Sequence, residues 1–350
     1  MNTLVIEKSA LKHNVSRIKE LAGSAYVYAN LSGDGQGLGA APLALLLRDE
    51  GVSRFAVDSV ESAQAVRKAG LVDEELLMLR SLTDRAALEQ LADLNVICSV
   101  GSLEAGMALN AVAENRSTVI EAHLEIDSGM GFGGFPAEEP EKIVTVVHNL
   151  PNVAFSGVYT QLASTKALPA QLELFQKAVD ALREAGCETG LVHAAGSFAL
   201  LHSDLTHLDA VRAGSALLGR CQRTRGDGLT LVGYGEAAVE SVRWLPAGHT
   251  VGNEKRKTLR KPTRTAVIPV GYQNGFGVEP PASGLWEALR RLRRQHRRTV
   301  RINGQRARIL GSIGASQILV NVTSLKCSEG DIATFDIEPI FARGFRREFR

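Results

Sequence analysis

The sequence predicts an α/β protein with a TIM-like (β/α)8 barrel over residues 1–222 and a mostly β C-terminal domain over residues 223–350. Eight short, nearly continuous apolar runs alternate with helix-patterned segments in the first part of the chain. Such runs are typical of parallel strands buried on both faces, and eight strand–helix units within about 200 residues favour a closed barrel over an open doubly wound sheet. After Leu218-Gly219-Arg220 the pattern changes to alternating strands, which places the domain boundary near residue 222.

The elements follow in order along the chain. A strand over 3–7 and a helix over 10–22 open it. The predicted barrel strands are 25–31, 54–57, 76–79, 95–98, 119–126, 153–160, 191–194 and 208–212, with helices such as 60–69, 83–93 and 170–185 between them. Because a barrel places its active site at the carboxyl ends of its strands, the residues that follow each strand are the candidates for function.

The second domain is predicted from alternation and turn residues. Its expected strands are 229–245, 263–271, 299–303, 306–310 and 317–322, and one amphipathic helix is expected over 284–297. The pair Asn303-Gly304 lies between two strand-like segments, which is a strong signal for a two-residue hairpin.

Charge and cysteine content exclude several classes of protein. With 40 basic and 38 acidic residues the net charge is +2, so we expect no general attraction to nucleic acid or to a membrane surface. The basic run 290–298 is expected to be a solvated helix face. The four cysteines (Cys98, Cys187, Cys221 and Cys327) lie far apart, and neither they nor the histidines have metal-ligand spacing. With no apolar signal segment, we expect a cytoplasmic protein with free thiols and no metal.

A glycine-rich loop follows the first predicted barrel strand, within Ala25–Ala40. Its glycines, at 33, 35, 37 and 39, alternate and therefore do not form the G-x-G-x-x-G dinucleotide fingerprint. A strand that ends in such a loop just before a helix is a common ligand position in α/β proteins.

Several segments, in one order, resemble the alanine racemase family. They are VIEKSALKHNVSRI near the start, DSVESAQAVRKAG (58–70), HLEIDSGMGFGGF (123–135), GVYTQLAS (157–164), VHAAGSFALL (192–201), AVRAGSALLG (210–219), VIPVGYQNGFG (267–277) and INGQRARILGSIGASQ (302–317). The glycine-loop form is most similar to the broad amino-acid or ornithine racemase-like branch. The resemblance implies a homodimer that binds pyridoxal phosphate, and it covers nearly the whole chain.

The resemblance also assigns site residues. The family holds pyridoxal phosphate on a lysine within a V-K-A-x-x-Y-G-H-G pattern, and laying that pattern on L-S-G-D-G-Q-G-L-G puts Ser32 at the lysine and Gln36 at the phosphate-holding tyrosine. It implies that Tyr272, from a second subunit, is the retained base. The remaining cofactor positions implied by the resemblance are Ser197, Gly214 and Ser215 at the phosphate and Arg212 at the pyridine nitrogen.

These assignments predict a protein that does not racemise amino acids. Serine forms no Schiff base and is too weakly basic to take a Cα proton, so we expect no covalently held cofactor and pyridoxal phosphate at most non-covalently. The first hypothesis is a homologue that keeps a pocket for an amino acid or phosphate-bearing ligand at the barrel mouth. A second is an enzyme with Tyr272 as its only base. A third is a dimer partner that lends Tyr272 to an active paralogue.

Overall fold

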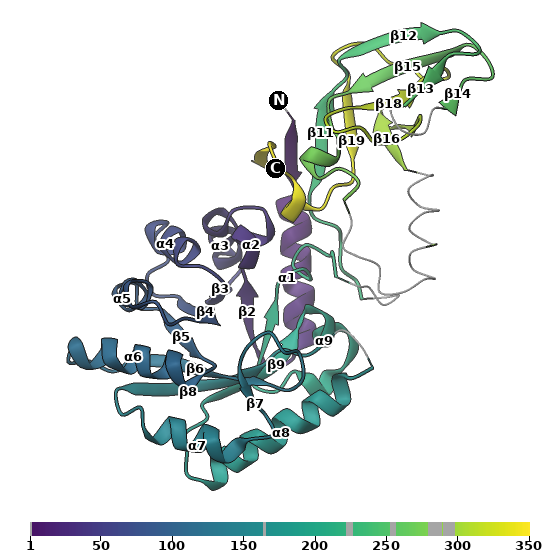
Figure 1. Cartoon of the computed structure of the whole chain (residues 1–350). Helices are drawn as coiled ribbons and strands as arrows, with labels where there is room; N and C mark the ends of the chain where they lie inside the picture. Colours follow the sequence, from purple (N-terminus) through teal and green to yellow (C-terminus); the bar gives the residue numbers. More distant parts are fainter. Residues whose placement is uncertain (1, 164–165, 222–226, 253–256, 279–288, 290–297) are drawn as a thin grey trace. The chain divides into compact units, whose positions relative to one another are not determined.

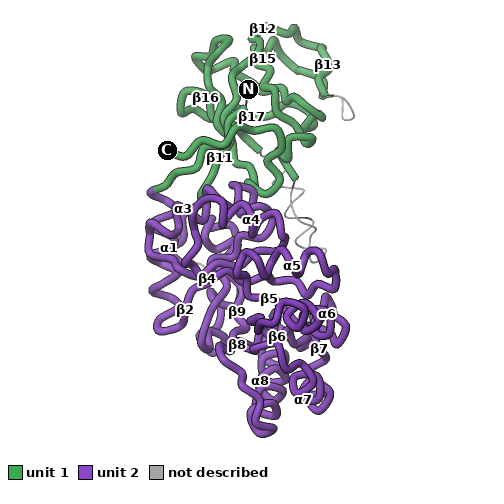
Figure 2. Tube along the Cα trace, turned by 90° about the vertical axis from the view of Figure 1, so that its left-hand side faces the viewer, with its two compact units in different colours: residues 1–8, 232–350 green, residues 9–231 purple. Residues whose placement is uncertain are grey.

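The structure is a computed structural model that describes every residue except 1, 164–165, 222–226, 253–256, 279–288 and 290–297 (Figure 1). The chain divides into two compact units (Figure 2). The barrel unit is Ser9–Leu231, and the β unit combines Met1–Lys8 with Val232–Arg350. None of the described helices is long and apolar enough to cross a membrane.

The barrel unit contains eight parallel strands that close on themselves, because β5 pairs with both β4 and β6. Each strand is bonded to its parallel neighbours around the ring, in the order β2, β3, β4, β5, β6, β8, β9 and β10. The strands are β2 (Tyr26–Asn30), β3 (Arg54–Val57), β4 (Glu75–Ser81), β5 (Ile97–Val100), β6 (Ile120–Asp127), β8 (Val153–Thr160), β9 (Leu191–Gly196) and β10 (Ala210–Ala213), and the short β7 (Phe135–Pro136) pairs with β6. The predicted barrel is confirmed.

Helices follow the strands along the chain (Figure 1). Their buried side chains are mainly apolar, such as Leu43 and Leu47 of α3 and Val66 of α4. Ser59, Asp84 and Ser102 cap α4, α5 and α6 by accepting the backbone N–H three residues on. The helices of this unit are α1 (Lys8–Ala22), α2 (Ser32–Gln36), α3 (Ala40–Asp49), α4 (Val60–Lys68), α5 (Arg85–Asp93), α6 (Leu103–Asn115), α7 (Pro140–His148), α8 (Leu168–Glu184), α9 (Ser197–His202) and the 3-10 turn η1 (Asp204–Thr206).

The β unit is built on a nine-stranded sheet that is antiparallel except where β1 pairs with β20. Its order is β12-β15-β18-β17-β16-β19-β11-β1-β20, with a separate β13–β14 pair. The strands are β1 (Thr3–Ile6), β11 (Tyr234–Ala238), β12 (Ser241–Leu245), β13 (Thr250–Val251), β14 (Lys257–Thr258), β15 (Thr263–Ile268), β16 (Thr299–Ile302), β17 (Gln305–Ile309), β18 (Ile318–Asn321), β19 (Ile332–Phe335) and β20 (Arg346–Phe349), with 3-10 turns η2 (Tyr272–Asn274) and η3 (Pro339–Phe341).

The structure has the predicted hairpin, but it divides the chain at a different residue from the one predicted. Ile302 pairs with Gln305, and Asn303 and Gly304 both have positive φ (49° and 76°), as the two-residue turn requires. The division falls between Leu231 and Val232, later than the expected 222, and β1 belongs to the β unit because it bonds to β11 and β20. The predicted helix over 284–297 and the basic run 290–298 lie almost wholly outside the described residues.

Candidate functional site

A cavity of about 320 Å³ lies at the carboxyl ends of β2, β8, β9 and β10. We call it the Ser197 cavity. Five of the residues singled out in the sequence line it, namely Gln36, Ser197, Arg212, Gly214 and Ser215, together with Asn30, Gln161 and Cys221 among others. Residues far apart in the sequence therefore converge at the end of the barrel where ligands bind in this fold.

The glycine loop brings Gln36 to this cavity through a left-handed turn. Gly33, Asp34 and Gly35 all have positive φ (68°, 53° and 63°), so the segment assigned as α2 is not a regular helix. A Cβ at Gly35 would lie 2.9 Å from the backbone nitrogen of Ala40, which explains why glycine stands there. The Gln36 amide then donates to the carbonyl oxygens of Asn30 (3.3 Å) and Ser32 (3.1 Å).

The Ser197 hydroxyl stabilises the loop after β10 by accepting two hydrogen bonds from it, and its own proton stays available for donation. Its hydroxyl oxygen accepts the backbone N–H groups of Gly214 (2.9 Å) and Ala216 (3.1 Å). A serine hydroxyl has two acceptor sites and one donor, so these two bonds leave its O–H free to donate. A Cβ at Gly214 would lie 3.0 Å from Nε2 of Gln36, so a glycine at this position leaves space for the Gln36 side-chain amide.

Arg212 is the buried cation of the site, only 3% exposed. One terminal nitrogen donates to Nδ1 of His193 (2.7 Å), and the other donates to the Thr160 carbonyl (2.6 Å) and to Oε1 of Gln161 (3.2 Å). Because a guanidinium only donates, Nδ1 of His193 must accept, and its Nε2–H then donates to Nδ1 of His123 (2.9 Å). This chain requires both histidines to be neutral.

The pKa shifts agree with that assignment. Burial, and next the nearby Arg212 charge, lower the pKa of His123 to about 3 and that of His193 well below its usual value. Burial also lowers the pKa of Arg212 to about 10, which leaves it charged at neutral pH. The site therefore presents one fixed positive charge and two neutral imidazoles.

Tyr28 fills the barrel interior beside this chain. It is fully buried, is the Cα partner of Arg212 across β2 and β10, and stacks on His193 with ring centroids 5.6 Å apart. Its hydroxyl donates to Glu75 at the opposite end of the barrel, where Glu75 also accepts from Arg54 (3.1 Å). Burial raises the pKa of the Tyr28 hydroxyl, so it remains protonated.

A second, smaller cavity of about 150 Å³ shares Arg212 and Gln161 with the first. We call it the Glu125 cavity, after the carboxylate that lines it with Asp127 and Tyr159. Glu125 was not predicted from the sequence, although His123, Glu125 and Asp127 alternate along β6 and so share a strand face. Tyr28 was not predicted either, since an apolar run gave no reason to single out one aromatic residue.

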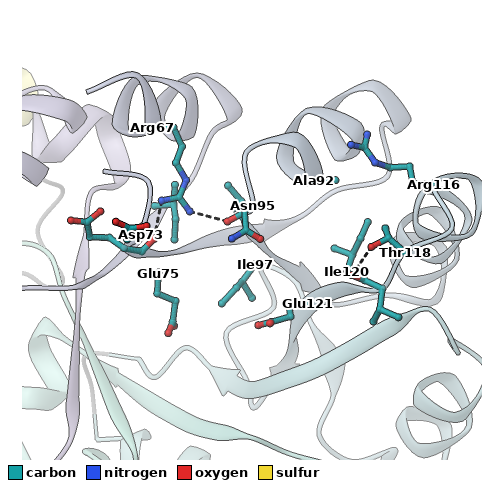
Figure 3. Close-up of a pocket in the computed structure, with 14 residues that line it drawn as sticks. Arg67, Asp73, Glu75, Ala92, Asn95, Ile97, Arg116, Thr118, Ile120 and Glu121 are labelled. Carbon is teal, nitrogen blue, oxygen red and sulfur yellow. Dashed lines mark hydrogen bonds between the residues drawn. The ribbon is translucent and has the colours of Figure 1, made fainter. Parts of the chain in front are cut away.

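The largest of these cavities, about 630 Å³, lies at the amino ends of β4, β5 and β6 (Figure 3). Arg67 projects into it and donates to four backbone carbonyls, those of Leu71, Glu74, Leu94 and Asn95, at 2.7–2.8 Å. These bonds fasten the loops that precede the strands. This Arg67 cavity contains none of the residues predicted to be functional.

Two of the predicted site residues lie outside the Ser197 cavity. Ser32 is half-buried at the start of the left-handed turn, with its N–H donating to Oδ1 of Asn30 (2.9 Å), and it is not among the lining residues. Tyr272 belongs to η2 of the β unit and is 56% exposed. The roles assigned to these two residues stay predictions.

Family models match both parts of the chain. The model of the alanine racemase N-terminal domain matches residues 6–222, and that of the C-terminal domain matches residues 234–338. The chain belongs to the alanine racemase family. The resemblance found in the sequence is thereby confirmed.

Named relatives agree with this membership. An alanine racemase of Carboxydothermus hydrogenoformans is 31% identical over 325 residues, which cover 89% of this chain and 83% of that protein. A broad specificity amino-acid racemase of Pseudomonas taetrolens is 28% identical over 327 residues, 91% of this chain and 76% of that protein. The alanine racemase of Bartonella henselae has a similar fold, with a TM-score of 0.84 at 21% identity, covering 100% and 99% of the two chains.

The comparisons correct the prediction about the cofactor. The Bartonella structure is described as having covalently bound pyridoxal phosphate, so the expectation of no covalently held cofactor, with non-covalent binding at most, is contradicted. That expectation rested on one position, Ser32, in one register of the glycine loop. In the structure, the described residues that line the Ser197 cavity offer hydroxyl and amide groups suited to a phosphate. They include no lysine whose amine could bond to the carbonyl carbon of pyridoxal phosphate.

Proposed function

We propose that this alanine racemase-family protein binds a small phosphate-bearing ligand in the Ser197 cavity and does not racemise amino acids at ordinary rates. The observation that carries the proposal is the convergence of Gln36, Ser197, Arg212 and the Gly214–Ser215 loop on one cavity without a lysine. An amino acid is the other candidate ligand; it would bind through its carboxylate, which carries less negative charge than a phosphate.

The chemistry of the lining favours an anion. Arg212 is the charged residue among the described residues that line the Ser197 cavity, and its buried guanidinium attracts negative charge through a medium of low dielectric constant. The Ser197 O–H is available to donate to a phosphate oxygen. These groups bind and orient a ligand without breaking any of its bonds.

The absence of racemisation is proposed from the family pattern. Racemisation needs a base on each face of the Cα carbon, and the family's lysine is one of them. The family pattern V-K-A-x-x-Y-G-H-G can be aligned with this sequence in two registers. Aligned with residues 27–35, it matches Val27, Ala29, Gly33 and Gly35 and places Tyr28 at the lysine. Aligned four residues later, it places Ser32 at the lysine. The burial of Tyr28 beside Arg212 supports the first register. Both registers remove the lysine.

Calorimetry with inorganic phosphate and an alanine interconversion assay test the proposal together. We expect phosphate to bind, and we expect interconversion of D- and L-alanine, with pyridoxal phosphate supplied, to be at least about 10²-fold slower than for the Carboxydothermus enzyme. Alanine turnover within tenfold of that enzyme would overturn the proposed loss of activity. Absence of phosphate binding would overturn the proposed ligand.

A pair of lysine variants tests the register. Tyr28→Lys and Ser32→Lys are each incubated with pyridoxal phosphate, treated with borohydride and weighed by mass spectrometry, with folding checked by thermal melting. We expect a covalent adduct on Tyr28→Lys and none on Ser32→Lys, because Tyr28 adjoins Arg212. The reverse result would establish the Ser32 register.

A second candidate function follows from the exposure of Tyr272. A tyrosine side chain that is 56% exposed on η2 is accessible to another chain. We propose a homodimer, or a heterodimer in which Tyr272 is supplied to a lysine-bearing paralogue, in the cytoplasm. Light scattering of the purified protein, and stimulation of an active paralogue by wild type but not by Tyr272→Phe, test these two forms. A monomer that gives no such stimulation would exclude both.

A further inference from the structure

The Glu125 cavity adjoins the Ser197 cavity, and the two differ in charge. Arg212 is the charged residue among the described lining residues of the Ser197 cavity, whereas Glu125 and Asp127 accompany Arg212 in the smaller one. Arg212 and Gln161 line both cavities, so a ligand that extended past these two side chains would have one end in each. Such a ligand meets a positive lining at one end and a net negative lining at the other.

The two carboxylates of the smaller cavity have different roles. Asp127 is largely occupied by its own loop, since it accepts the N–H groups of Gly129 (2.8 Å), Met130 (2.8 Å) and Gly131 (2.9 Å). Glu125 takes part in none of the ion pairs among the described residues, and the Tyr159 hydroxyl beside it donates to Ser99 (2.9 Å), whose own proton goes to the Met78 carbonyl. A carboxylate accepts more than one hydrogen bond, so Glu125 retains capacity for a ligand.

A glycine makes room for the Glu125 carboxylate. A Cβ at Gly101 would lie 2.8 Å from its Oε2, which is closer than a Cβ approaches an oxygen, whereas a Cβ at Gly133 would lie 3.7 Å from its Oε1, an ordinary contact. The absence of a side chain at Gly101 therefore leaves space for this carboxylate at the cavity wall.

Neutralising Arg212 is the alternative role for Glu125, and the geometry disfavours it. The guanidinium directs its bonds to His193, Thr160 and Gln161, and no hydrogen bond joins it to Glu125. Burial raises the pKa of the Glu125 carboxyl, although the Arg212 charge lowers it. A carboxylate placed only to balance Arg212 would be expected to contact it directly.

We propose that the Glu125 cavity binds an ammonium group, so that the ligand of this protein is a phosphorylated amine with its phosphate in the Ser197 cavity. This inference rests on the proposed function for the phosphate end. The amine end is recognised by Glu125 through a charge-assisted hydrogen bond.

Matched pairs of ligands test the inference by calorimetry. The probes are propyl phosphate with 3-aminopropyl phosphate and butyl phosphate with 4-aminobutyl phosphate, and propylamine is the probe without a phosphate. We expect the amine to improve affinity about tenfold in at least one pair, the gain of one charge-assisted hydrogen bond. Glu125→Gln should abolish the difference while keeping the affinity for the alkyl phosphate. Glu121→Gln, at an exposed position of the same strand, should leave the difference unchanged.

Each outcome has a separate meaning. Equal affinities within every pair for wild type would overturn the ammonium site and leave the phosphate site standing. Failure of wild type to bind any alkyl phosphate would overturn the proposed function, and propylamine binding that is lost in Glu125→Gln would still support the ammonium site. If Glu125→Gln fails to bind alkyl phosphate, wild type is measured across pH instead. The difference in affinity between the two ligands of a pair should then shrink as pH falls through the raised pKa of Glu125. The titratable and charged groups that face Glu125 are Arg212, Tyr159 and Asp127. A difference in affinity that stays constant with pH would overturn the inference.

Discussion

The two ends of the barrel each have a cavity with an arginine that donates to backbone carbonyls, but in different surroundings. Arg67, at the amino end, is half-buried, and its four acceptors are loop carbonyls; the bond to Asn95 is exposed (Figure 3). Arg212, at the carboxyl end, is almost fully buried, and its partners include the neutral His193. The larger cavity is therefore a structural feature of the loops. The smaller ones contain the two groups that we propose for ligand binding, the Ser197 hydroxyl and the Glu125 carboxylate.

The largest expected effect comes from removing the buried arginine. Arg212→Leu leaves Nδ1 of His193 and the Thr160 carbonyl without a donor inside the barrel, where water cannot replace it. We expect the free energy of unfolding to fall by about 3–5 kcal/mol, measured by urea denaturation at pH 7. A loss below about 1 kcal/mol would mean that the interior admits water and that the contrast with Arg67 is unfounded.

The neutral histidines predict a fall in stability with acid. A folded-state pKa for His123 of about 3 lies below the unfolded value near 6.5, so between those limits the unfolded chain binds the additional proton. We expect the free energy of unfolding to drop by about 1–2 kcal/mol per buried histidine between pH 6.5 and pH 5.

Two variants separate this effect from general acid sensitivity. His123→Gln should reduce the dependence on pH, and His202→Gln, at an exposed position, should not. Identical pH profiles for wild type and His123→Gln would contradict the assignment of a neutral His123.

Ligand binding should respond only at the carboxyl end. Ser197→Ala removes a donor to phosphate and the acceptor of two backbone N–H groups, so we expect inorganic phosphate to bind about five- to tenfold more weakly in calorimetry. Ser53→Ala, at an exposed residue just before β3 at the amino end, should bind phosphate like wild type. Equal weakening by both variants would remove the distinction between the two ends.

The smallest effect is expected at the larger cavity. Arg67→Leu removes four hydrogen bonds, but the position is half-exposed and the bond to Asn95 faces solvent, so we expect a loss of about 1 kcal/mol in unfolding free energy, below that for Arg212→Leu. Phosphate affinity should not change. A shift in phosphate affinity would show that the amino-end loops influence the distant site.

The sequence predicts the barrel well because each strand carries its own local signal. The expected strands 54–57 and 153–160 coincide with β3 and β8. Local patterns cannot tell which sheet a strand joins, so they do not show that β1 bonds to β11 and β20. β20 was missed because RREF, a charged strand at the end of its sheet, lacks an apolar run.

The candidate site was predicted in part. Gln36, Ser197, Arg212, Gly214 and Ser215 were assigned from resemblance, and the structure brings them to one cavity. The interior partners were beyond prediction, because the bonds of Arg212 to His193 and of Tyr28 to Glu75 join residues that only barrel closure brings together. Glu125 was within reach, since the alternation in HLEID places it on the same strand face as His123.

The place of β1 has a consequence for the order in which the chain folds. Thr3 pairs with Glu236 on one side and with Arg346 on the other, so the first strand finds both its neighbours only after nearly the whole chain has been synthesised. The barrel unit, Ser9–Leu231, is complete much earlier. Contacts of such long sequence separation form late because of the chain entropy that they cost. Residues 3–6 are therefore expected to reach their native positions after the barrel unit has formed.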